Sequence, residues 1–203
     1  MKKSIVVLFV AILAVSNIRC SIYKTIVNIS RLQFKLGNVD RFMVNGVSLE
    51  GKTSVSDFNP IDVLKLTAAI AQRSFPVTFT LNVEAKNPND GKGGYTRTDA
   101  TLKSFPWSLY IDDKQTISGN IESPITVPGT GEVTVIPIQV RLDLFKFFAD
   151  KGYESLVNLA LAISGNKGTS SNLVLYAQPT ISTIIGDITY PQQLKIVSLS
   201  YSN

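Results

Sequence analysis

The chain has 203 residues, 44% of them hydrophobic, and carries 20 basic and 15 acidic side chains but no histidine. The lack of histidine excludes Ser-His-Asp and Cys-His catalysis and histidine-ligated zinc, and a single cysteine excludes thiolate metal clusters. The basic residues form no dense cluster, so neither nucleic-acid binding nor any cofactor is expected.

Residues 1–19 have the layout of a secretory signal peptide. The positive start Met1-Lys2-Lys3 is followed by an apolar run at residues 5–15 and a short polar segment. That run is shorter than the about 20 residues that a membrane-spanning helix needs. The protein is therefore expected to be exported, and removal of residues 1–19 would leave 17 basic residues against 15 acidic ones.

Cys20 is the only cysteine and follows this segment directly. Its position is typical of a bacterial lipoprotein, whose mature chain begins at a lipid-modified cysteine. We therefore predict lipidation of Cys20, a tether at residues 20–28, and a location at the periplasmic face of the outer membrane. Arg19 is unusual just before such a cysteine, and cleavage after Ser16 remains the alternative, which would leave Cys20 as a free thiol.

The body of the chain is predicted to be mainly β. From residue 77 to residue 85 apolar and polar side chains alternate, which indicates a half-buried strand. A change of parity near Pro137 indicates a bulge or an edge strand. Many short antiparallel strands point to a β-sandwich. The strands are expected at residues 77–85, 99–105, 107–111, 117–121, 125–127, 132–144, 173–177, 184–190 and 194–201.

A helix is predicted from Pro60 to about Arg73, with Asn59 as its N-cap. We expect it to pack on the sandwich or to cap one end of it. The residues expected to face the core form one stripe, widened by Leu66 and Ile70: Ile61, Leu64, Ala68 and Ala71. A second helical stretch, residues 143–163, is predicted to be broken at Gly152 and ended by Gly165.

The remaining polar motifs favour structural roles. Asp112 and Asp113 are adjacent at a strand end, where turn residues are common. The stretch Gly91-Lys92-Gly93-Gly94 lacks the helix and hydroxyl residue of a phosphate-binding loop. Enzyme activity is therefore not expected.

The alternating strand that ends in Asn87-Pro88-Asn89 resembles the signature of late embryogenesis abundant (LEA) type 2 domains, also called WHy domains. The order downstream is similar as well: the strand at 107–112, Ile117-Ser118-Gly119, the turn Pro128-Gly129-Thr130-Gly131 and a helical stretch. The resemblance implies an immunoglobulin- or fibronectin-III-like antiparallel sandwich. It divides a single domain, residues 29–203, into an N-terminal extension (29–74) and a core (75–203), with no catalytic residue.

Two functions follow from this resemblance and from the predicted anchor. The first is a non-enzymatic envelope lipoprotein that acts through protein or surface contacts and protects against stress. The second is a secreted or periplasmic module that carries an apolar small molecule, which would require an enclosed apolar cavity of about 300 Å³ or more. Asn87 is expected to form an Asx turn, and Trp107 and Tyr110 are expected to be core and border residues of a strand.

Overall fold

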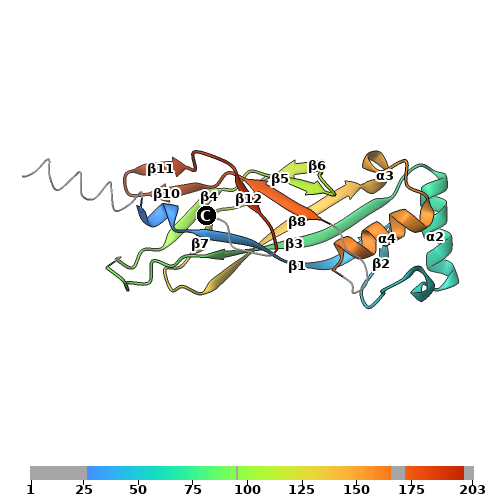
Figure 1. Cartoon of the computed structure of the whole chain (residues 1–203), viewed down its shortest axis with the longest axis horizontal. Coiled ribbons are helices and arrows are strands. Elements are labelled where there is room, and N and C mark those ends of the chain that lie inside the picture. The colour runs from blue at the N-terminus through green and yellow to red at the C-terminus, as the bar shows by residue number, and fades with distance from the viewer. Residues whose placement is uncertain (1–26, 95, 166–171, 199–203) are drawn as a thin grey trace, which may run out of the picture.

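The alternation of the strand β3 (Pro76–Lys86) defines the buried face of the first sheet. The computed structural model describes residues 27–94, 96–165 and 172–198. In it, the odd-numbered residues of β3 from Val77 to Ala85 are at most 2% exposed. The strand lies between β1 (Gln33–Val44) and β8 (Val133–Asp143), and β2 (Val47–Ser48) extends the sheet beyond β1 in the antiparallel order β2-β1-β3-β8 (Figure 1).

The second layer consists of two further antiparallel sheets. One has the order β11-β10-β4-β7 and the other the order β12-β9-β5-β6. Their strands are β4 (Ala100–Ser104), β5 (Trp107–Ile111), β6 (Lys114–Gly119), β7 (Ile125–Val127), β9 (Leu173–Ala177), β10 (Thr180–Thr183), β11 (Gly186–Thr189) and β12 (Leu194–Ile196). The predicted mainly β sandwich is confirmed.

A proline lies at each connection between these two sheets. Pro106 lies between β4 and β5, Pro179 between β9 and β10, Pro191 between β11 and β12, and Pro124 directly before β7. Because proline has no N–H, it cannot donate to the strand ladder. The backbone N–H of Gln178 donates to the Pro106 carbonyl at 3.0 Å, so neighbouring breaks lie side by side. The second layer is thus a four-stranded layer divided across its middle.

β8 confirms the predicted edge position. It lies at the border of its sheet, and its pairing with β3 runs through Pro137 without a register shift. Val133 and Val135 point outward and are 49% and 51% exposed, whereas Ile136 and Ile138 are buried. The change of parity in the sequence therefore reflects apolar residues on both faces of the strand, and no bulge is present against β3.

Several strand predictions were incomplete or wrong. β1, β2 and β10 were not predicted, and the strand expected at 117–121 lies at Lys114–Gly119. The strand expected at 184–190 begins at Gly186, because residues 184 and 185 form the turn after β10. Residues 199–201 of the last predicted strand lie outside the described residues.

The first predicted helix is confirmed as α2 (Pro60–Ala71), which follows the short 3-10 helix η1 (Val55–Asp57). The Asn59 side chain accepts a hydrogen bond from the Asp62 N–H at 2.8 Å, as expected of an N-cap. At the other end, the Ser74 N–H donates to the Ala69 carbonyl and the Arg73 N–H to the Ile70 carbonyl. These two bonds form a Schellman motif, with Arg73 at a φ of +54°.

The second helical stretch is also confirmed. It consists of α3 (Leu144–Phe147) and α4 (Tyr153–Ile163), separated at Gly152, and Gly165 has a φ of +81° just after α4. The Asp143 carboxylate caps α3 and also accepts from the Phe75 N–H at 2.7 Å. It thereby joins the start of α3 to the start of β3.

Candidate functional site

The molecule has two distinct ends. A helical turn at residues 27–30 begins the described chain at the end where β10, β11 and the loop after β3 lie, whereas α2, α3 and α4 lie at the other end (Figure 1). Cys20, the predicted lipidation site, lies outside the described residues.

Asn87 follows β3 directly and its side chain is completely buried. Its Nδ2 donates to the carbonyl oxygens of Thr98 (2.8 Å) and Val127 (3.0 Å). Its Oδ1 accepts from the Asn89 N–H at 3.2 Å, which confirms the predicted Asx turn. Both polar atoms of the side chain are engaged within the protein, so Asn87 joins three backbone segments.

Asn89 extends this junction to the beginning of the described chain. It is 1% exposed; its Nδ2 donates to the Asn28 carbonyl at 2.8 Å, and its Oδ1 accepts from Arg31 Nη1 at 2.9 Å. A short polar motif after β3 thus fixes the position at which residues 27–31 join the sandwich. The sequence did not predict these partners, because they lie about 60 residues away along the chain and no short-range sequence pattern indicates such contacts.

A pocket of about 620 Å³ lies beside this junction and is open to solvent. Apolar groups come from Ile29, Ala100, Ile181 and Ile184, but eight polar residues complete the lining: Asn28, Asn89, Thr96, Thr98, Asp99, Thr101, Ser182 and Thr183. Its volume lies within the range of ligand pockets, yet it is not the enclosed apolar cavity that a carrier would require.

Tyr190 is buried at the end of the molecule where the described chain begins. It is 7% exposed, and its hydroxyl donates to the Ile29 carbonyl at 2.6 Å. Burial raises the pKa of Tyr190 well above its ordinary value, so the neutral phenol is favoured in the folded protein. The hydrogen bond links the last third of the chain to its beginning.

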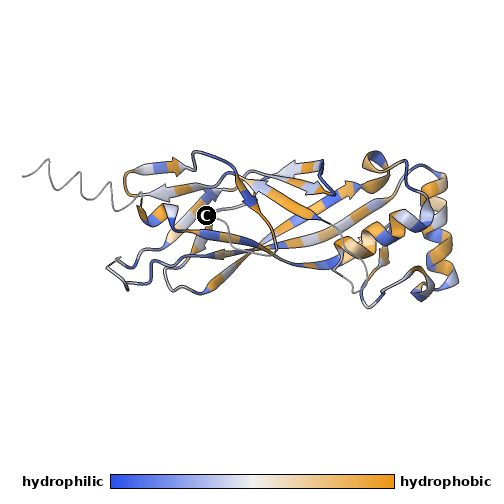
Figure 2. Ribbon diagram, in the orientation of Figure 1, coloured by the Kyte–Doolittle hydropathy of each residue, from blue (hydrophilic) through white to orange (hydrophobic). Residues whose placement is uncertain are grey.

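At the opposite end, the predicted orientation of α2 is confirmed for the widening residues Leu66, which is buried, and Ile70, which packs partly buried against the core, but is wrong for the central stripe. The stripe Ile61, Leu64, Ala68 and Ala71 was expected to face the core but is exposed, Ile61 by 66% and Leu64 by 70%. The side of α2 that is buried carries Leu66 and Ala69. Figure 2 shows hydrophobic residues along α2 at this end of the molecule. An apolar helix face therefore has no partner within the described part of the chain.

The acidic pair Asp112 and Asp113 has the structural role expected from the sequence. Both residues have positive φ, +47° and +63°, and they connect β5 to β6, since Ile111 pairs with Lys114. Two positive φ values are those of a type I′ hairpin turn. Among the described residues, no group of three or more His, Cys, Asp or Glu side chains is placed to hold a metal ion.

Trp107 and Tyr110 lie on β5 as expected. Trp107 is 6% exposed and packs across Gly119, where a Cβ would lie 2.6 Å from Trp107 Cζ2. Tyr110 is half-buried and makes an edge contact with Tyr176, with the ring centroids 5.1 Å apart. Both aromatic side chains therefore serve the packing of this sheet. No helix in the described ranges is long and apolar enough to span a bilayer.

No family model matches this chain. No curated protein matches it either. Three solved structures are similar to it, and one of them is assigned to the LEA proteins that the sequence resembles: its TM-score is 0.38 at 18% identity, over 89% of this chain and 80% of that chain.

The other two structures are similarly distant. A protein from Archaeoglobus fulgidus has a TM-score of 0.35 at 14% identity, over 77% of this chain and 90% of that chain. An Arabidopsis thaliana protein has a TM-score of 0.34 at 16% identity, over 63% of this chain and 75% of that chain. These values are too low to assign the chain to the family of any of the three.

Proposed function

We propose that the protein is a non-enzymatic, membrane-tethered envelope protein that presents the outer face of α2 to another protein. The observation that carries this proposal is the exposure of the stripe Ile61, Leu64, Ala68 and Ala71. Contiguous apolar surface on a folded body is typical of interaction sites. Among the polar residues considered in the sequence, Asn87 and the pair Asp112 and Asp113 are used in a buried junction and a turn.

The proposed tether is lipid-modified Cys20. Six residues separate it from residue 27, so an extended chain would reach about 25 Å from the membrane surface to the body. The chain joins the body beside Asn89, at the end remote from α2. This arrangement would direct α2 away from the tether, toward partners in the periplasm.

The chemistry of α2 defines the partner. Within α2 the exposed residues are apolar or small apart from Thr67 and Lys65, which carries the charge on this face. A protein with an apolar groove or helix face bordered by carboxylates would complement it. A stress-protective role, such as holding an envelope protein folded during drying, rests on the resemblance to LEA type 2 domains alone.

A carrier of apolar small molecules is the second candidate. The pocket of about 620 Å³ between Ile29 and Ile181 favours it by size. Its open mouth favours it less, because a carrier excludes water from an apolar ligand. We therefore rank the carrier below the tethered protein.

Two measurements in a double-membrane bacterium test the proposed function. Intact mass should show a chain that begins at a lipid-modified Cys20 in the membrane fraction, and Cys20→Ala should release the protein from that fraction. A photo-crosslinking amino acid at Leu64 should yield a discrete protein adduct in intact cells, with Lys65→Glu reducing the yield. The matched control is the same group at Val135, which is 51% exposed on β8.

Two results would contradict the proposed function. A soluble mature chain beginning at Asn17 would disprove the tether. Equal adducts from positions 64 and 135 would show that α2 is not a specific contact surface.

A further inference from the structure

The tip of the β10–β11 hairpin is apolar. Thr183 pairs with Gly186, so Ile184 and Ile185 alone form the turn between the two strands. Ile184 is 90% exposed and Ile185 is 45% exposed. Turns favour glycine, asparagine, aspartate and serine. Two adjacent isoleucines have none of the properties that favour a turn, and their exposure to water is unfavourable. The stability of the fold therefore does not explain why two isoleucines occupy this turn.

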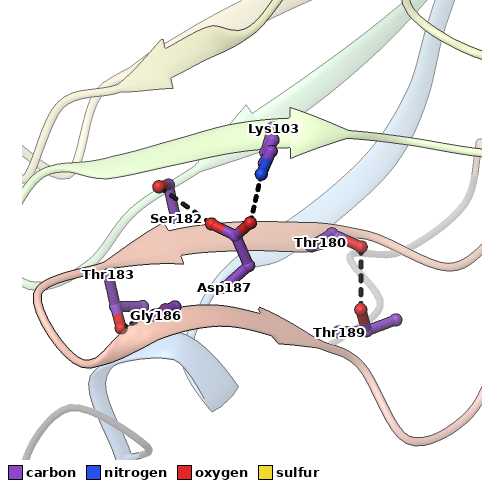
Figure 3. A network of polar contacts seen from close by, with 7 residues as sticks. All are labelled: Lys103, Thr180, Ser182, Thr183, Gly186, Asp187 and Thr189. Carbon is purple, nitrogen blue, oxygen red and sulfur yellow. Dashed lines mark hydrogen bonds and ion pairs between the residues drawn. The ribbon is translucent and has the colours of Figure 1, made fainter.

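The stem below the tip is fixed by polar contacts (Figure 3). Lys103 on the neighbouring strand β4 forms an ion pair with Asp187, which also accepts from the Ser182 hydroxyl at 3.1 Å. The hydroxyls of Thr180 and Thr189 lie 2.9 Å apart across the two strands. The hydrogen bond from Lys103 lowers the pKa of Asp187, so this carboxylate is charged at neutral pH. A stem held in this way presents the tip in one direction, which limits the entropy lost on binding.

The tip lies beside the start of the described chain. Ile184 lines the same pocket as Asn28 and Ile29. α2 is separated from this region by the 11 residues of β3, a length of about 35 Å. The end of the molecule that receives the proposed tether thus carries two exposed isoleucines at the tip of a hairpin whose strands are joined by polar contacts.

We propose that Ile184 and Ile185 insert into the interfacial layer of the phospholipid bilayer to which the protein is tethered. This inference rests on the proposed tether at Cys20, because the tether holds this end near the lipid. Burial of exposed apolar side chains in the bilayer interface is favourable. Within the stem, the charge of Lys103 is compensated by Asp187, and burial of the two isoleucines requires no anionic lipid. We therefore expect apolar insertion that zwitterionic phosphatidylcholine supports.

The test uses the lipid-modified protein in phosphatidylcholine vesicles that contain brominated lipid. An environment-sensitive fluorophore is attached to Ile185→Cys or, as the matched control, to Leu64→Cys on α2. Lipid modification blocks the thiol of Cys20, so the label attaches to the introduced cysteine. The label at 185 should shift to shorter wavelength and be quenched by the brominated lipid, and the label at 64 should remain in water.

A second pair of variants separates insertion from folding. Aspartate is common in turns, so Ile184→Asp should leave the hairpin folded. It should lower the equilibrium constant for insertion of the tip, measured by quenching of the label at 185, about tenfold. Ile61→Asp, at a strongly exposed isoleucine of α2, should leave the quenching of the label at 185 unchanged. A label at 185 that stays unquenched, or whose signal depends on protein concentration because a second copy covers the tip, would overturn the inference.

Failure of the tether would be recognised separately. If mass shows an unmodified Cys20, the proposed function fails, and the secreted mature chain with Cys20→Ser is mixed with the same vesicles. Quenching at 185 and not at 64 would then support insertion without a tether. An absence of quenching at both positions would overturn insertion as well.

Discussion

In the turn after β3, Asn87 uses one side chain to join its own turn to the carbonyl oxygens of Thr98 and Val127. An amide is suited to this position because it donates and accepts at the same time. Aspartate has the same shape but would place a second acceptor against two carbonyl oxygens. The junction therefore depends on a hydrogen-bond donor at this position and on more than its volume.

We predict that Asn87→Asp destabilises the protein more than Asn87→Ala at pH 7. The alanine variant leaves two buried carbonyls unpaired, at a cost of about 2–4 kcal/mol, and the aspartate variant adds a buried charge. Burial would raise the pKa of the introduced carboxyl, so the variant should regain stability as pH falls and the acid is protonated. Urea unfolding at pH 7 and pH 4.5 measures this. Equal stability of the two variants at both pH values would contradict it.

At the scale of elements, α2 shows how a helix end is determined locally. Arg73 occupies the left-handed position of the Schellman motif, with a φ of +54°, where glycine is the usual residue because a Cβ is disfavoured there. The motif is complete even so, and the chain turns from α2 into β3 within a few residues.

Arg73→Gly should therefore stabilise the protein by about 0.5–1 kcal/mol. Removal of the Cβ relieves strain at the left-handed residue, and the greater conformational entropy of glycine in the unfolded chain offsets part of this gain. The melting temperature should rise by about 1–4 °C. Arg73→Ala keeps the Cβ and serves as the control, for which we expect no gain. A higher melting temperature for alanine than for glycine would show that the positive φ is not the cause.

At the scale of the whole molecule, distant parts of the chain close the sandwich. The Leu36 N–H donates to the Val197 carbonyl at 3.1 Å, which joins the first sheet to the second layer along one side. The hydroxyl of Tyr190 makes a comparable long-range link to the Ile29 carbonyl. These contacts hold the first described residues and the last strand together.

Tyr190→Phe should cost about 1–2 kcal/mol near pH 8, because the Ile29 carbonyl loses its donor. Burial raises the pKa of Tyr190 in the folded state above the unfolded value of about 10. The neutral phenol therefore stabilises the fold below pH 10, and this contribution is lost as pH rises further. The difference in unfolding free energy between the two proteins should shrink from pH 8 to pH 11. A constant difference would show that Tyr190 does not titrate in this way.

The candidate surfaces show how far the sequence alone could go. The junction at Asn87 was predicted as a turn, but its partners Thr98 and Val127 could not be, because they are 11 and 40 residues away. The isoleucines of the tip were assigned to a strand, since a run of apolar β-branched residues favours one. Gly186, with a φ of +111°, was the signal for the turn.

The sequence by itself determined several elements and boundaries: the cap at Asn59, the breaks at Gly152 and Gly165, the turn at Asp112 and the alternation of β3. These signals depend on φ, on proline and on hydrogen bonds within a few residues. The tertiary structure alone decided which face of α2 is buried. Apolar residues lie on both sides of that helix, Leu66 on one and Leu64 on the other, so periodicity cannot choose between them. The choice is made by the neighbouring elements against which one face packs.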